Sequence, residues 1–154
     1  MEQGMDLILW RHADAEDGVP DAPRKLTAKG EKQALLMGQW LNANLPQQYK
    51  VMASPTVRTQ QTAKALNKKI ETVQALGPGA DATTVLAAAG WPDAKGAVVI
   101  VGHQPTLARV AALLLAGAES DWSMKKGSVW WLSNRVRQNE TQTVLRVMMS
   151  PEFL

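Results

Sequence analysis

The sequence contains no cysteine, which excludes disulfide bonds, thiol nucleophiles and thiolate metal sites. It also has no apolar run that approaches the length of a membrane-spanning helix, so we expect no contact with a membrane. It has no internal repeat and no run of Lys or Arg longer than two. Basic residues scattered in this way, without aromatic residues between them, do not indicate nucleic-acid binding.

What is present is typical of a globular protein. A chain of 154 residues, 45% hydrophobic and 20% charged, has room for one compact domain and little room for an inserted lid. We therefore predict a single domain over residues 1–154 that acts as a monomer. The excess of 17 Lys and Arg over 14 Asp and Glu gives a formal net charge of +3, which modestly favours anionic ligands. Residues 1–6 carry acids instead of the basic start of a secretory signal, so we expect a cytoplasmic protein.

A short apolar segment near the start, Leu7–Trp10, predicts a buried strand that ends at Arg11 and His12. In open α/β sheets, ligands bind where the strands end. An arginine beside a histidine at that point suggests an anion site with a nucleophile or a proton carrier. Taken alone, the pair fits equally well a capped histidine beside a solvated arginine, so the rest of the chain must decide.

Hydrophobic spacing, caps and chain breakers predict alternating strands and helices along most of the sequence. Ser54 and Pro55 are expected to cap and open one of the helices, and two strands near the end are expected to form a hairpin with Trp130 and Trp131 on opposite faces. The predicted helices cover 27–44, 54–67, 81–89 and a segment after Pro105, and the predicted strands cover 7–10, 49–53, 69–74, 97–101, 128–133 and 143–149.

This alternation predicts a three-layer α/β domain with a central, largely parallel mixed sheet flanked by helices. Arg58 lies in the first turn of a helix that follows a strand, and side chains on a helix lean back towards its N-terminus. His103 directly follows the strand 97–101. Each residue has a plainer interpretation, a surface arginine and a capping histidine. In the predicted sheet, however, Arg11, His12, Arg58 and His103 converge at one edge.

Two arginines and two histidines, without a neighbouring carboxylate cluster, make a poor metal site and a good phosphoryl site. We therefore expect no metal and no cofactor. Guanidinium groups match the oxygens of a phosphoryl group and stabilise its charge during transfer. The chemistry that this suggests is covalent, with one imidazole attacking phosphorus to form a phosphohistidine that water then hydrolyses.

Four segments, in their order along the chain, resemble the histidine phosphatase superfamily: Arg11-His12-Ala13; Leu26-Thr27 with Gly30 and Gln33-Ala34; Ser54-Pro55 with Arg58-Thr59 and Thr62-Ala63; and Gly102-His103. Within the superfamily, the short length and the Arg-His-Ala-Asp-Ala form resemble the SixA phosphohistidine phosphatases. The resemblance implies a phosphoglycerate mutase-like fold and His12 as the catalytic nucleophile. It also implies that Arg11, Arg58 and His103 bind the phosphoryl oxygens. Ala13 replaces the glycine that is commonest in the first motif.

Larger members of the superfamily place a carboxylic acid near the pocket to protonate an oxygen leaving group. Here Asp14, Glu16, Asp17 and Asp81 are candidates by position only, and a solvated loop carboxylate fits each of them better. A site without an acid suits cleavage of a P–N bond, because the leaving imidazole can already carry a proton near neutral pH. An open pocket without a lid would also suit a phosphorylated protein.

The sequence therefore predicts a phosphatase that acts on the phosphohistidine of a signalling protein, which the resemblance implies is a histidine phosphotransfer domain. The alternatives are a small-molecule phosphomonoesterase or mutase of the same superfamily and a non-catalytic phosphate-recognition module. The first would be supported by a positioned acid and a closing loop. The second is disfavoured because all four side chains of the constellation are intact.

Overall fold

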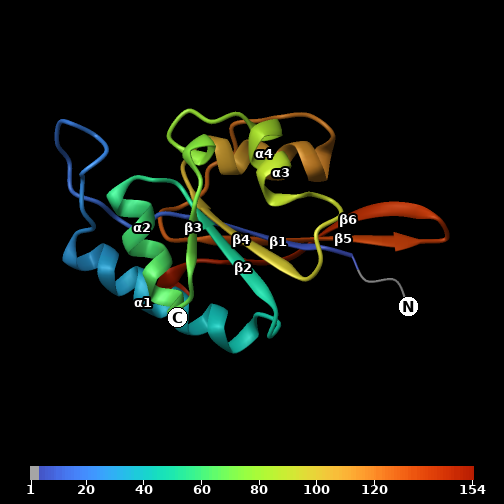
Figure 1. Ribbon diagram of the computed structural model, residues 1–154, viewed down its shortest axis with the longest axis horizontal. Coiled ribbons are helices and arrows are strands. Elements are labelled where there is room, and N and C mark those ends of the chain that lie inside the picture. Colours follow the sequence, from blue (N-terminus) through green and yellow to red (C-terminus); the bar gives the residue numbers. More distant parts are fainter. Residues whose placement is uncertain (1–3) are drawn as a thin grey trace.

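The computed structural model describes residues 4–154, and residues 1–3 of the acidic opening segment lie outside the described residues. A six-stranded sheet with the strand order β3-β2-β4-β1-β5-β6 runs between two layers of helices (Figure 1). None of the helices formed by residues 4–154 has both the length and the apolar character needed to cross a membrane. The strands are β1 (Asp6–Arg11), β2 (Tyr49–Ala53), β3 (Ile70–Thr72), β4 (Ala97–Gly102), β5 (Val129–Arg137) and β6 (Glu140–Met149), and the helices are α1 (Ala28–Asn44), α2 (Val57–Ala63), α3 (Ala82–Ala89) and α4 (Thr106–Ala116).

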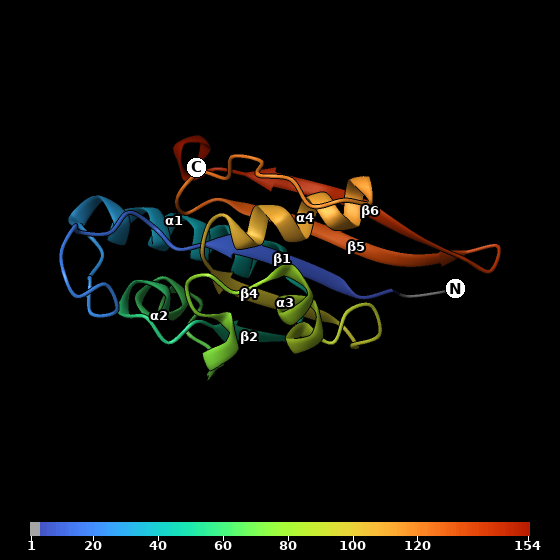
Figure 2. The same cartoon turned by 90° about the horizontal axis from the view of Figure 1, so that it is seen from above.

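The sheet is mixed and mostly parallel, as predicted. Strands β3, β2, β4 and β1 pair in parallel, whereas β5 is antiparallel to both β1 and β6. Seen from above, the hairpin of β5 and β6 extends the sheet beyond β1 (Figure 2). Because they are parallel, β1, β2 and β4 all end at one side of the sheet, at Arg11, Ala53 and Gly102. We call this side the carboxyl edge.

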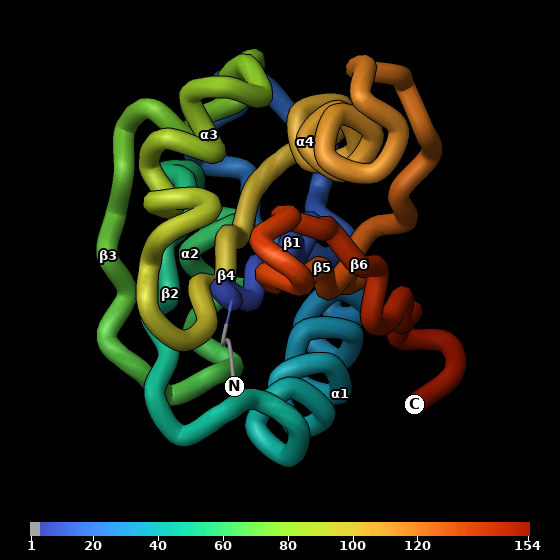
Figure 3. Tube along the Cα trace, turned by 90° about the vertical axis from the view of Figure 1, so that its right-hand side faces the viewer, coloured from blue at the N-terminus to red at the C-terminus, as the bar shows by residue number. Residues whose placement is uncertain are grey.

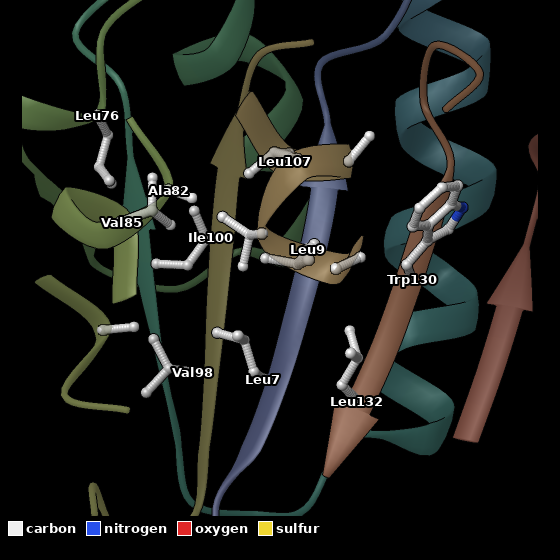
Figure 4. Packing of buried hydrophobic residues seen from close by; sticks show 14 of the residues in the cluster. Leu7, Leu9, Leu76, Ala82, Val85, Val98, Ile100, Leu107, Trp130 and Leu132 are labelled. Carbon is white, nitrogen blue, oxygen red and sulfur yellow. The ribbon is translucent and has the colours of Figure 1, made fainter. Parts of the chain in front are cut away.

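Helices cover both faces of the sheet. Figure 3 shows α3 and α4 on one face and α1 on the other. Strand β1 is buried from both sides: Leu7 and Leu9 pack in the cluster under α3 and α4 (Figure 4), and Ile8 and Trp10 pack in the cluster that includes α1 and α2. All four of these side chains are fully buried. This burial on both faces fixes where β1 ends, and therefore where the residues that follow it emerge.

The start of α1 packs closely against Asp14, in the segment that follows β1, and Thr27 is hydrogen-bonded to it. Thr27 caps the helix, and its hydroxyl accepts a hydrogen bond from the backbone N–H of Gly30, as its position in the sequence predicted. A Cβ atom at Gly30 would lie 1.9 Å from the carbonyl oxygen of Asp14. Only glycine allows the helix to approach the backbone this closely.

The hairpin at the end of the chain is longer than predicted. The polar segment 134–142 was expected to separate its strands, but β5 and β6 run through most of it and turn at Gln138 and Asn139, which both have positive φ angles. The reason is that β6 is an edge strand, so its polar side chains face solvent without interrupting the pairing. Trp130 and Trp131 do face opposite sides of the sheet, and the ring of Trp131 meets that of Trp40 edge-on at 6.2 Å.

The prediction for the start of α2 was wrong. Ser54 and Pro55 precede the helix, Thr56 occupies the cap position, and α2 begins at Val57. A short 3-10 helix over Lys64–Leu66 continues it almost to the predicted end. The side chain of Ser54 is engaged elsewhere, by a residue that follows β4.

Candidate functional site

The structure brings the predicted constellation together at the carboxyl edge. His12 directly follows β1, and His103 directly follows β4. The backbone N–H of His12 donates to the carbonyl of Gly102 at 3.0 Å, and the two imidazole rings lie 5.4 Å apart between centroids. From α2, the Nη2 atom of Arg58 lies 3.5 Å from Nδ1 of His103. Two adjacent parallel strands and the helix that follows a third strand therefore supply these side chains.

The contacts of His12 fix the tautomer and the neutral state that a histidine nucleophile needs. Its Nδ1 atom lies 2.7 Å from the carbonyl oxygen of Ala13. Because a carbonyl only accepts, Nδ1 carries the ring proton, and Nε2 keeps its lone pair. Burial lowers the pKa of His12 to about 4, and the charges of Arg58 and Arg11 act in the same direction against the opposing effect of the Ala13 carbonyl. The imidazole is therefore neutral at neutral pH.

His103 contacts a different set of groups. Its Nε2 atom lies 2.8 Å from the hydroxyl oxygen of Ser54, and its Nδ1 atom faces Arg58. Burial lowers the pKa of His103 to about 3, and the charge of Arg58 adds to the effect. This ring is also neutral at neutral pH. Ser54, which was predicted to be a helix cap, is thus part of the site.

The two arginines are partly bound by protein groups and partly unpaired. Arg11 donates through Nη1 to the carbonyl of Met124 at 2.6 Å, and Arg58 donates through Nη1 and Nη2 to Asp21. The Nε atoms of both arginines are buried without a hydrogen-bond partner among the described residues. A buried N–H without an acceptor is costly, and an oxyanion at this edge would give such donors partners. This arrangement fits a phosphoryl group.

Sequence reasoning missed Asp21. Its carbonyl oxygen and its Oδ2 atom accept from Arg58 at 3.1 and 3.0 Å, and the N–H of Val57 donates to the next carbonyl, that of Ala22. The Arg58 guanidinium holds the pKa of the Asp21 carboxyl below its usual range. No spacing in the sequence links positions 21 and 58, and the only signal was that Asp21 lies in a polar loop after the first strand.

The loop formed by residues 14–24 contacts the start of α2, next to side chains of the site that are buried. His12, Arg58 and His103 expose only 7%, 3% and 5% of their surfaces. Contacts from Asp21 and Ala22 hold this loop against the start of α2. The loop is thus joined to α2 through Arg58 and Val57, while its residues 16–23 are themselves exposed.

Two of the four carboxylates considered as acids form hydrogen bonds with groups outside the constellation, and the other two are exposed. Asp14 accepts from the Thr27 hydroxyl at 2.7 Å, which lowers the pKa of its carboxyl, and Asp81 caps α3 through the N–H of Thr84. Glu16 and Asp17 are exposed. Within residues 4–154, no side-chain hydrogen bond or ion pair joins Asp14, Glu16, Asp17 or Asp81 to the two histidines or to Arg58.

Comparisons with known proteins identify a family and several relatives of this chain. The family described as "Histidine phosphatase superfamily (branch 1)" matches residues 7–78. An uncharacterised protein of Picosynechococcus is 33% identical, over 97% of this chain and 99% of its own length. The homologue of the phosphohistidine phosphatase SixA in Haemophilus influenzae is 31% identical, over 71% of this chain and 77% of its own. A solved structure from Nakamurella multipartitia, assigned provisionally as a phosphohistidine phosphatase SixA, superposes with a TM-score of 0.78 at 26% identity and covers 96% of both chains.

Proposed function

This chain belongs to the histidine phosphatase superfamily, and we propose that it removes the phosphoryl group from a phosphorylated histidine of a signalling protein through a covalent intermediate on His12. The observation that carries the proposal is the 2.7 Å contact from Nδ1 of His12 to the Ala13 carbonyl, since it leaves Nε2 as a neutral nucleophile beside two arginines. The similarity to SixA phosphohistidine phosphatases supports the choice of substrate. A histidine phosphotransfer domain is the substrate class that we propose.

The reaction has two steps. The lone pair of His12 Nε2 attacks phosphorus, the bond between phosphorus and the substrate imidazole breaks, and that imidazole leaves with the bonding electron pair and takes up a proton. Water then attacks the phosphoryl group on His12, releases inorganic phosphate and restores the neutral ring. Arg11, Arg58 and His103 donate to the phosphoryl oxygens as charge develops on them. Guanidinium groups supply this stabilisation, so the proposed reaction uses no metal and no cofactor.

The leaving group favours a phosphohistidine substrate. Among residues 4–154, Asp21 is the carboxylate that pairs with Arg58, and Arg58 lowers the pKa of the Asp21 carboxyl. An ionised carboxylate at neutral pH is a poor proton donor for an alkoxide leaving group. An imidazole leaving group needs less help, because its own pKa lies near neutrality.

A small-molecule phosphomonoesterase of the same superfamily is the second candidate. The observation that favours it is the small exposed fraction of His12, Arg58 and His103, because small substrates are commonly enclosed during the reaction. For the phosphohistidine phosphatase we also propose that residues 1–154 form a single domain, that the protein works in the cytoplasm as a monomer, and that it binds neither nucleic acid nor a membrane.

The experiment that separates the two candidates compares phosphate release from a phosphorylated histidine phosphotransfer domain with release from p-nitrophenyl phosphate and phosphoserine, all in the presence of a metal chelator. We expect kcat/KM to be highest for the phosphohistidine protein and lowest for phosphoserine, whose leaving alcohol is the least acidic. The His12→Ala variant gives the background rate for each substrate. Efficient hydrolysis of phosphoserine would favour the second candidate, and loss of activity with the chelator would contradict the metal-free mechanism.

A further inference from the structure

The hydroxyl group of Ser54 contacts one of the two ring nitrogens of His103. The side chain of Ser54 is fully buried, and its Oγ atom lies 2.8 Å from Nε2 of His103. The other ring nitrogen, Nδ1, lies 3.5 Å from Nη2 of Arg58. Burial keeps His103 neutral at neutral pH, so the ring has a single N–H. The nitrogen that carries this proton decides what His103 offers to a phosphoryl oxygen.

The contacts of Ser54 determine the position of that proton. The backbone N–H of Thr56 donates to the Ser54 hydroxyl over a long 3.4 Å contact, in which the hydroxyl oxygen is the acceptor and its proton is not used. Among the contacts formed by residues 4–154, the acceptor for the hydroxyl proton of Ser54 is Nε2 of His103. If Nε2 carried the ring proton instead, the buried hydroxyl would lose this acceptor, and Nδ1 would gain only a contact of 3.5 Å from Arg58, at the outer limit of a hydrogen bond.

We propose that Ser54 is a positioning residue that donates to Nε2 of His103 and so fixes the ring proton on Nδ1, where His103 and Arg58 both donate to the same phosphoryl oxygen. The inference rests on the phosphoryl chemistry proposed for this site. It explains why the two donors approach each other without forming a good hydrogen bond between them. A shared anionic acceptor satisfies both donors, and a neutral protein group cannot do so as strongly.

The backbone around Ser54 makes the residue suitable for substitution. Its N–H donates to the carbonyl of Val101 at 3.1 Å, and its carbonyl accepts from the side chains of Thr59 and Gln60, each at 2.8 Å. These bonds do not involve the hydroxyl. Ser54→Ala therefore removes the contact to His103 and keeps the bonds that position the backbone.

The test uses the fact that the sequence has only two histidines, His12 and His103. Nitrogen-15 NMR of the imidazoles reports which ring nitrogen is protonated, and His12→Asn assigns the remaining signals to His103. In the wild type we expect protonated Nδ1 in both rings. In Ser54→Ala we expect the His103 signals to shift towards the other tautomer while those of His12 stay unchanged. The affinity for vanadate should fall by about tenfold, as loss of one oriented donor predicts.

Ser133→Ala is the matched control, because Ser133 is another buried serine whose hydroxyl is hydrogen-bonded, to Asp6 at the opposite end of β1. It should leave the His103 signals and the vanadate affinity unchanged. A wild-type His103 protonated on Nε2, or a Ser54→Ala variant with unchanged tautomer and unchanged vanadate affinity, would overturn the inference. Because the NMR readout does not depend on turnover, absence of phosphohistidine hydrolysis alone would refute the proposed function and not the role of Ser54.

Discussion

Arg58 donates two hydrogen bonds to Asp21, one to its carbonyl oxygen and one to its carboxylate. This pair joins the loop after β1 to the guanidinium group that is proposed to bind the transferred phosphoryl group. Arg24 pairs with the other carboxylate oxygen of Asp21 at 3.0 Å, so the acid has a partner on each side. The loop therefore shapes the site through an ion pair as well as through its backbone.

Arg58→Lys should lower kcat/KM by at least about tenfold although it keeps the charge. A lysine ammonium cannot contact Asp21 and a phosphoryl oxygen with the fixed geometry of a guanidinium fork. Steady-state kinetics with a phosphorylated histidine phosphotransfer domain measures the change. Arg24→Lys is the control, because Arg24 also pairs with Asp21 but, among the described residues, forms no hydrogen bond with either histidine, and it should change kcat/KM little. Near wild-type kinetics for Arg58→Lys would remove Arg58 from the phosphoryl site.

Asp21→Asn should reduce phosphohistidine hydrolysis only a few-fold. The amide keeps the shape of the side chain and an oxygen for Arg58. Asp21 is not expected to donate a proton, because Arg58 lowers the pKa of its carboxyl. Asp17→Asn, an exposed residue of the same loop, controls for the change in charge. The same few-fold limit applies to single replacement of Asp14, Glu16 or Asp81. A hundredfold loss from any of these changes, measured as kcat, would identify a general acid and favour the phosphomonoesterase.

The stability of the protein should fall as the pH drops below about 6.5. In the unfolded chain both histidines take up protons near their ordinary pKa of 6.5, whereas burial keeps His12 neutral down to about pH 4 and His103 down to about pH 3. The unfolded state therefore binds more protons in this window, and the free energy of unfolding decreases as the pH falls, by up to about 1.4 kcal/mol per pH unit for each histidine.

Denaturant titrations at pH 7, 6 and 5 measure this slope. The carboxylates with lowered pKa values contribute mainly nearer pH 4, so comparison with His12→Asn isolates the histidine effect. That variant should show a shallower loss of stability between pH 6.5 and 5. Equal slopes for the variant and the wild type would mean that His12 titrates normally in the folded protein.

The strands and helix caps that position the site could be predicted from the sequence, because each depends on residues that are close together along the chain. A buried apolar segment ending at Arg11 and another ending at Gly102 define two parallel strands, and their ends meet at one edge. The cap at Thr27 and the cap at Asp81 place α1 and α3 to within a residue or two. The predicted positions of His12 and His103 follow from these elements.

The remaining features depend on contacts between distant residues. Ser54 and Pro55 have the local pattern of a helix start, but the hydroxyl of Ser54 binds His103, 49 residues away, and α2 begins three residues after Ser54. Asp21 reaches Arg58 across 37 residues. The polar residues of β6 are compatible with a strand only because β6 lies at the edge of the sheet. Local patterns carry no information about such partners.

Covalent attack by His12 is the central claim, and trapping the intermediate tests it most directly. The enzyme is mixed briefly with a phosphorylated histidine phosphotransfer domain, quenched in alkali, digested and analysed by mass spectrometry. We predict an acid-labile phosphoryl group on the peptide that contains His12, and none in His12→Ala, which should remain folded and lose turnover. A phosphoryl group found only on another residue, or near-normal turnover in His12→Ala, would contradict the account.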